Sequence, residues 1–236
     1  MTVLYEDNHI IIVNKESGEI VQGDKTGDTP LSGVVKAYIK ERHAKPGNVF
    51  LGVVHRLDRP VQGAVVFAKT SKALTRLNSM FAHHADNSGP LTPDEIRKTY
   101  WAVTRNTPRE PEGTLRHWLV RNEKQNKSYA TPWTPAGKPP RNAKLAELHY
   151  RVIDRSDRYT LLEVELLTGR HHQIRAQLAA MGCPIKGDLK YGAQRSNPDA
   201  SISLLARKVE FIHPVSKEHI KVEAPLTPQF KIFNKQ

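Results

Sequence analysis

Apolar residues recur along the chain with two different periods, which separate predicted helices from predicted strands. A period of about 3.6 residues runs through 31–43 and 71–81, with an apolar stripe on one face and polar residues on the other. Ser71 is the residue type expected at a helix N-cap. A third helix is predicted over 170–181, ending at Gly182.

Strands are predicted where β-branched and aromatic residues cluster or alternate with polar ones. These segments are a strand pair within 3–15, then 64–68, 98–104, 115–120, 145–153, 159–167, 204–211 and 219–222. Polar or proline-rich stretches at 23–27, 86–93 and 131–141 predict loops, and the last is a candidate RNA contact. Helices and strands mixed without a βαβ rhythm predict an α+β fold with a largely antiparallel sheet.

Composition narrows the class of partner and the compartment. The 236 residues, 38% of them hydrophobic, suffice for one or two domains, and a net charge of +12 favours a polyanionic partner such as RNA. No apolar run approaches the roughly 20 residues that span a bilayer, and the N-terminus lacks a basic signal sequence, so we expect a cytoplasmic protein. The single cysteine, Cys183, excludes an internal disulfide and is predicted to be buried.

The strongest candidate for chemistry is Asp58, which lies between Arg56 and Arg59 just before a glycine and an apolar strand. Such a charged cluster is costly to bury, so it must pair internally or face a cleft. Taken alone, it would more often be a surface ion-pair cluster. We interpret Asp58 as a candidate catalytic carboxylate and the two arginines as candidate RNA-binding residues.

Three ordered motifs resemble the RluA-like family of RNA pseudouridine synthases, the ribosomal large-subunit type. They are HRLD at 55–58, K-x-Y-x-A at 98–102 and TGRxHQIR at 168–175, and weaker agreements extend over nearly the whole chain. Two departures are Glu16, where the family usually has proline, and Val61-Gln62, where it often has Thr-Ser. Neither touches the carboxylate, so they bear on substrate preference.

The resemblance implies one catalytic domain over 1–236. Its bent, mostly antiparallel mixed sheet would be flanked by helices and divided into two subdomains, with a central active-site cleft. Members of the family often carry an N-terminal S4-type RNA-binding module. Because the motifs begin almost at residue 1, we expect no S4 domain here.

The resemblance also implies site residues. Asp58 would act at the ribose of the target uridine as nucleophile, as electrostatic stabiliser or as base at C2′, and the sequence leaves these roles open. Arg175 would be its partner and lower its pKa. Tyr100 would stack on the flipped uracil and assist removal of the C5 proton, while Leu204 or Leu205 would form an apolar wall beside the base.

Other residues of the third motif are assigned more broadly. Arg170 is expected to contact RNA phosphate or to support the structure, whereas His172 and Gln173 could reach the cleft. His171 and His172, like the pair at 83–84, are expected to face solvent or RNA, because no carboxylate or cysteine lies at metal-ligand spacing. No phosphate-binding loop or dinucleotide motif occurs, so neither a cofactor nor a metal is expected.

The sequence therefore predicts an RNA pseudouridine synthase acting on ribosomal or transfer RNA without a cofactor. The alternative is a catalytically inactive RNA-binding protein on the same scaffold. A glycosidase is less favoured, because it would use two carboxylates across a cleft and the motifs supply only Asp58. Neither the target uridine nor the oligomeric state follows from the sequence.

Overall fold

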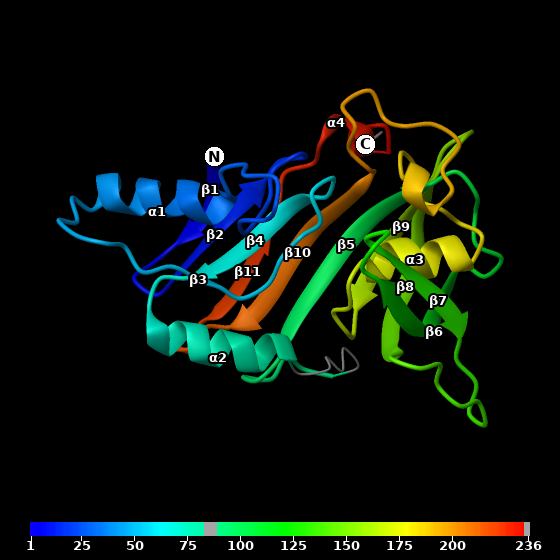
Figure 1. The fold of residues 1–236 in the computed structure, drawn as a ribbon, viewed down its shortest axis with the longest axis horizontal. Helices are drawn as coiled ribbons and strands as arrows, with labels where there is room; N and C mark the ends of the chain where they lie inside the picture. The colour runs from blue at the N-terminus through cyan, green and yellow to red at the C-terminus, as the bar shows by residue number, and fades with distance from the viewer. Residues whose placement is uncertain (83–88, 234–236) are drawn as a thin grey trace. The chain divides into compact units, whose positions relative to one another are not determined.

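The computed structural model describes residues 1–82 and 89–233, which fall into two compact units (Figure 1). Among these residues, the first unit contains 1–82, 89–96 and 206–225, and the second contains 97–205 and 226–233. The division into two units agrees with the prediction from the family resemblance. The predicted pair at 83–84 and part of the predicted loop 86–93 lie outside the described residues.

The first unit is built on a sheet with strands in the order β1-β2-β4-β10, while β3 pairs with β4 and β11 with β10. The strands are β1 (Thr2–Glu6), β2 (Ile10–Lys15), β3 (Gly52–Val53), β4 (Gln62–Ala68), β10 (Leu204–Ile212) and β11 (His219–Glu223). The first two residues of β10 belong to the second unit. The pairs β1·β2, β2·β4, β3·β4 and β10·β11 are antiparallel. Every residue of β2 and β4 is buried, so these strands form the centre of the core.

Two helices complete the first unit, α1 (Leu31–Arg42) and α2 (Ser71–Ala82). In each, residues at helical spacing are buried, as the apolar stripe predicts. The predicted cap of α2 is wrong by one residue. Thr70 Oγ1 accepts a hydrogen bond from the Ala73 amide, so Thr70 caps the helix and Ser71 is its first residue.

The second unit contains a sheet with the order β5-β9-β8-β6-β7, and all four of its strand pairings are antiparallel. Its strands are β5 (Ile96–Thr104), β6 (Glu112–Asn122), β7 (Lys127–Pro132), β8 (Lys144–Arg155) and β9 (Thr160–Leu166). The helical segments are α3 (Gln173–Ala180), a 3₁₀ turn η1 (Leu189–Tyr191) and α4 (Pro228–Lys231). Helix α3 packs on β6 and β7 through a small cluster centred on Leu119, Ala146 and Ala176. Cys183 is buried, as predicted.

The α+β class and the mostly antiparallel sheet are therefore confirmed, and most predicted elements are present. Strands β3 and β7 and helix α4 were not predicted. Helix α3 begins three residues later than predicted, because His172 has a left-handed backbone with φ of 52° and cannot belong to the helix. Arg170 consequently lies in the preceding turn and not in the first turn of the helix.

Candidate active site

Asp58 lies on a turn of the first unit between β3 and β4, where residues 54–61 form neither helix nor strand. The Val61 amide donates to the Asp58 carbonyl at 3.0 Å and closes the turn. Leu57 is buried, Asp58 is half-buried and Arg56 is exposed. The turn is thus anchored in the core by the residue that immediately precedes the carboxylate.

Lys15, at the end of β2, holds this turn from within. Its side chain is fully buried, and Nζ donates to the carbonyls of Glu16 at 3.0 Å, Arg59 at 2.9 Å and Val61 at 2.7 Å. Burial lowers the pKa of Lys15 to about 8, and the nearby carboxylates of Glu19 and Asp58 oppose that change. One buried ammonium therefore fixes the backbone on the C-terminal side of Asp58.

His55 fixes the other side of the turn. Its Nε2 accepts a hydrogen bond from the Val66 amide of β4 at 2.9 Å, and its ring stacks on Phe81 of α2 at 4.5 Å between centroids. An accepting Nε2 requires the tautomer that carries its proton on Nδ1. The first histidine of the motif thus supports the turn through β4 and α2.

Gly63 permits the close approach of β4 to β10. Its φ is +118°, and a Cβ at this position would lie 2.4 Å from the Ala206 carbonyl oxygen. No other residue type fits both the backbone and the space. The small residue after the motif is therefore required by packing, four residues beyond Arg59.

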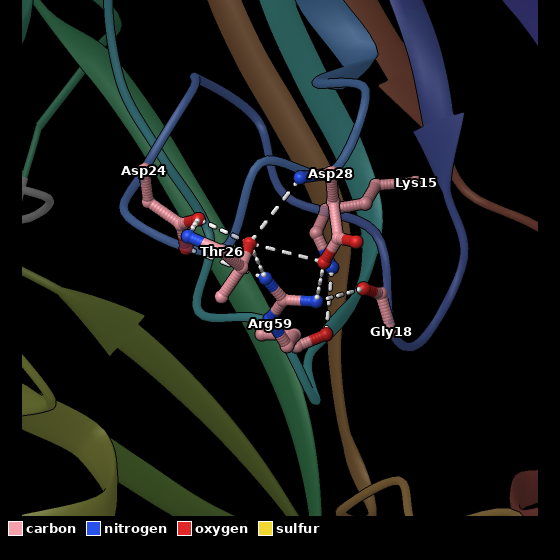
Figure 2. A network of polar contacts seen from close by, with 6 residues as sticks. All are labelled: Lys15, Gly18, Asp24, Thr26, Asp28 and Arg59. Carbon is pink, nitrogen blue, oxygen red and sulfur yellow. Dashed lines mark hydrogen bonds and ion pairs between the residues drawn. The ribbon is translucent and has the colours of Figure 1, made fainter.

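The side chain of Arg59 is engaged by the loop 24–28 (Figure 2). Nη1 contacts Asp28 Oδ2 at 2.7 Å and the Gly18 carbonyl at 3.3 Å, while Nη2 contacts Thr26 Oγ1 at 2.9 Å and Asp24 Oδ2 at 3.3 Å. Hydrogen bonds from Thr26 and from Arg59 lower the pKa of Asp24, and those from Arg59 and Thr26 lower that of Asp28. The arginine expected to contact RNA is thus an ion-pair partner of two aspartates in this structure.

The third motif lies in the second unit, where Gln173 organises its turn. The Gln173 Oε1 atom accepts from Thr168 Oγ1 at 2.7 Å and from the Arg170 amide at 2.9 Å, and Nε2 donates to the Glu147 carbonyl at 3.0 Å. Arg170 Nε donates to the Leu145 carbonyl at 3.0 Å. Of the two roles left open for Arg170, this contact supports the structural one.

Arg175 is held by a buried carboxylate that sequence analysis did not assign. Its Nε and Nη2 contact Asp188 Oδ2 at 2.7 Å and Oδ1 at 2.9 Å, and both side chains are almost fully buried. The guanidinium also lies 5.0 Å from the ring centroid of Tyr191. A two-point ion pair of this kind fixes the plane of the guanidinium. Asp188 and Tyr191 lie outside the three motifs, and nothing in the sequence linked them to Arg175.

His172 is buried, so the expectation that it faces solvent is wrong, whereas its reach into the cleft stays a prediction. The side chain is 7% exposed, and Nδ1 lies 2.9 Å from the Tyr191 hydroxyl, which accepts from the Ser128 amide at 2.8 Å. Burial, followed by the charge of Arg175, lowers the pKa of His172 to about 2. The imidazole is therefore neutral. His171 is half-buried, with Nδ1 2.9 Å from Ser128 Oγ.

Tyr100, Leu204 and Leu205 also belong to the second unit and are buried. Tyr100 is opposite Val164 in the β5·β9 pairing. Two positions before it, Lys98 is buried as well, and burial lowers its pKa to about 8. Both leucines are at the start of β10, so burial does not choose between them as the apolar wall.

Over residues 1–82 and 89–233, no group of three or more His, Cys, Asp or Glu side chains is arranged to bind a metal. No helix within these ranges has the length and apolar character needed to cross a membrane.

Comparison with known proteins identifies the class. A model of the RNA pseudouridylate synthase family matches residues 9–180, and the chain therefore belongs to this family. It is 31% identical over 233 residues to the uncharacterized RNA pseudouridine synthase YhcT of Bacillus subtilis, covering 98% of this chain and 70% of the relative. It is 29% identical to the ribosomal large subunit pseudouridine synthase C of Vibrio cholerae, over 95% of this chain and 65% of the relative.

A solved structure agrees with the fold. The human protein RNA Pseudouridylate Synthase Domain Containing 4 superimposes with a TM-score of 0.78 and 24% identity, covering 98% of this chain and 90% of that one. Family and relatives together make the chain an RNA pseudouridine synthase, an isomerase that modifies RNA.

Proposed function

We propose that this synthase isomerises a uridine of ribosomal RNA, with Asp58 as the carboxylate that acts on the ribose. The observation that carries the proposal is the construction of the Asp58 turn, which Lys15, His55 and Leu57 fix in the core while the carboxylate remains half-buried. Ribosomal RNA is favoured because relatives at 28–30% identity over most of the chain are named for the ribosomal large subunit. Such a substrate implies a cytoplasmic protein.

The reaction breaks the N1–C1′ bond, turns the uracil and joins C5 to C1′. The C5 proton is then lost and N1 takes up a proton from solvent, so the product is an isomer of the substrate. A carboxylate can attack C1′, stabilise positive charge there or remove a proton from C2′. We assign the role at the ribose to Asp58. Tyr100 would stack on the base and take part in removing the C5 proton, and Leu204 or Leu205 would form the apolar wall. Arg175 would be the cationic partner of the carboxylate.

The test compares pseudouridine maps of total RNA from wild-type cells, cells lacking the gene and cells complemented with Asp58→Asn. We expect the deletion to remove one or a few pseudouridines from large-subunit ribosomal RNA and the variant not to restore them. In vitro, Asp58→Asn should slow single turnover at least a hundredfold, since each 1.4 kcal/mol of barrier is about tenfold in rate. RNA affinity should stay within a few-fold.

Loss of a transfer RNA pseudouridine instead would transfer the proposal to that substrate. Restoration of the wild-type map by Asp58→Asn would remove the carboxylate from the chemistry. Turnover within tenfold of the wild-type rate would have the same meaning.

A further inference from the structure

Positive charge is concentrated in one segment of the second unit. Residues 121–144 contain six basic residues and one acidic residue, Glu123, a net charge of +5 out of +12 for the whole chain. The basic residues are Arg121, Lys124, Lys127, Lys138, Arg141 and Lys144, and none of them forms an ion pair with any residue that the structure describes. Lys127 is half-buried and the other five are exposed. Charges of one sign that lack internal partners attract a polyanion.

The segment combines the β6·β7 hairpin with the proline-rich loop that follows it. Strand β7 is the edge of its sheet and pairs with β6 from Asn122·Lys127 to His117·Pro132. Tyr129 is 46% exposed, and Lys127 Nζ lies 5.4 Å from the centroid of its ring. An exposed ring beside unpaired cations is a combination that binds bases and phosphates of single-stranded RNA.

The turn of the hairpin contacts the third motif, which contains Arg175, and η1, which contains Tyr191. Its turn residue Asn126 accepts from Lys190 Nζ at 3.1 Å through the carbonyl and lies 3.1 Å from His171 Nε2 through Oδ1. Lys127 Nζ is also 5.1 Å from the centroid of the Tyr191 ring, and the Arg175 guanidinium is 5.0 Å from the same centroid. A ligand bound along the hairpin would therefore adjoin the third motif within the same unit.

We propose that β6, β7, the loop 133–143 and Lys144 at the start of β8 form an RNA-docking surface, which we call the basic hairpin. It would bind the backbone of the substrate outside the reacting nucleotide, with Tyr129 stacking on an unpaired base. This inference rests on the proposed function, because the ligand is the RNA that the enzyme modifies. It adds a binding surface that does no chemistry, so its loss should weaken binding and spare turnover.

The test uses the full chain and a short RNA containing the modified uridine with its flanking nucleotides. The basic-hairpin variant is Lys124→Gln, Lys138→Gln, Arg141→Gln and Lys144→Gln. The matched control is Lys36→Gln, Lys40→Gln, Lys45→Gln and Lys72→Gln, which removes four exposed lysines of the first unit and changes the net charge equally. Binding is measured from low to physiological salt, and single turnover is measured at saturating RNA.

We expect the hairpin variant to bind at least tenfold more weakly at low salt. The log-log salt slope should become shallower by about two to three units, since each phosphate contact contributes roughly 0.7 to 0.9. The control should change the slope by less than one unit, and both variants should keep single turnover within twofold. Tyr129→Ala should weaken binding at least fivefold, while Tyr129→Phe should not.

An unchanged slope in the hairpin variant would overturn the docking surface, and so would an equal change in the control, because the effect would then belong to net charge. Either result with an active wild-type enzyme leaves the proposed function intact. An inactive wild-type enzyme on every RNA tested would instead contradict the proposed function itself.

Discussion

The Asp58 turn of the first unit and the start of α3 in the second unit hold their charged side chains by opposite means. In the first, Lys15 donates to three backbone carbonyls, so the backbone is fixed and the carboxylate is carried on it. In the second, Asp188 grips the guanidinium of Arg175 directly. The first arrangement positions a turn, and the second positions a functional group.

The two arrangements differ in how charge is balanced. Arg175 and Asp188 form a buried pair of opposite charges. Removing only one member of such a pair strongly destabilises the folded protein. Lys15 directs its three hydrogen bonds to neutral carbonyls and carries a pKa of about 8 as the consequence of burial. We therefore expect stability at the start of α3 to depend most on the charge of Asp188. At the Asp58 turn it should depend most on the hydrogen bonds that Lys15 donates.

Asp188→Asn should have the largest effect on stability, because it removes the charge of the buried carboxylate that accepts two hydrogen bonds from the Arg175 guanidinium. We expect the free energy of unfolding to fall by about 3–5 kcal/mol, measured by urea denaturation. The double variant Arg175→Met/Asp188→Leu should recover much of this stability but none of the activity. A double variant as unstable as Asp188→Asn alone would mean that packing, and not charge, dominates the site.

Lys15→Met should have the next largest effect. Buried carbonyls without a donor cost about 1–3 kcal/mol each, although the Arg59 carbonyl keeps the Gly18 amide at 2.9 Å. We expect at least a tenfold loss of single turnover together with reduced stability. The control Lys36→Met, at an exposed position of α1, should change stability by less than about 0.5 kcal/mol. Wild-type turnover in Lys15→Met would show that the turn keeps its geometry without the ammonium.

Most of the fold could be predicted because the period of apolar residues is a local signal. Strand β2 is dense in β-branched residues, β4 contains the apolar run 64–68, and α1 and α2 have clear apolar stripes. Strand β7 could not be predicted in this way, since half of its residues are exposed and it ends in proline. Its strand conformation depends on pairing with β6, which the sequence pattern does not encode.

Residues of the candidate site could be predicted from the sequence only where a motif contains them. Asp58 and Arg175 are in motifs, whereas the partners of Lys15 lie 44 and 46 positions away and Asp188 lies 13 positions from Arg175. Such contacts arise from tertiary packing and leave no periodic trace. The burial of His172 was not predicted for the same reason, because its contact with the Tyr191 hydroxyl is made by a residue of η1.

His172 provides a pH test of the second unit with a smaller expected effect. Its folded pKa of about 2 lies below the usual value near 6.5, so the unfolded chain binds a proton that the folded chain does not. Stability should therefore fall as pH falls below about 6.5, by up to about 1.4 kcal/mol per pH unit from this group. His172→Asn keeps a residue that tolerates the left-handed backbone and lacks the titration.

The measurement is the difference in free energy of unfolding between wild type and His172→Asn at pH 7.5, 6 and 5. We expect the advantage of the wild type to narrow between pH 6 and pH 5, since carboxylates common to both proteins cancel in the difference. A difference independent of pH would contradict a neutral buried imidazole.

The smallest effect is expected at the loop that engages Arg59 in the first unit. Asp24→Asn and Asp28→Asn together remove both carboxylate partners of the guanidinium, but Lys15 and the Gly18 amide still hold the Arg59 carbonyl. Because the turn is fixed through its backbone, single turnover at saturating RNA should change by less than about fivefold. Removal of two acidic groups beside a released arginine should strengthen RNA binding two- to threefold at low salt, an advantage that added salt should screen.

The control Asp157→Asn, exposed in the second unit, should leave both turnover and RNA affinity unchanged. A large loss of turnover with unchanged affinity would mean that the side-chain contacts of Arg59, and not only its carbonyl, position Asp58.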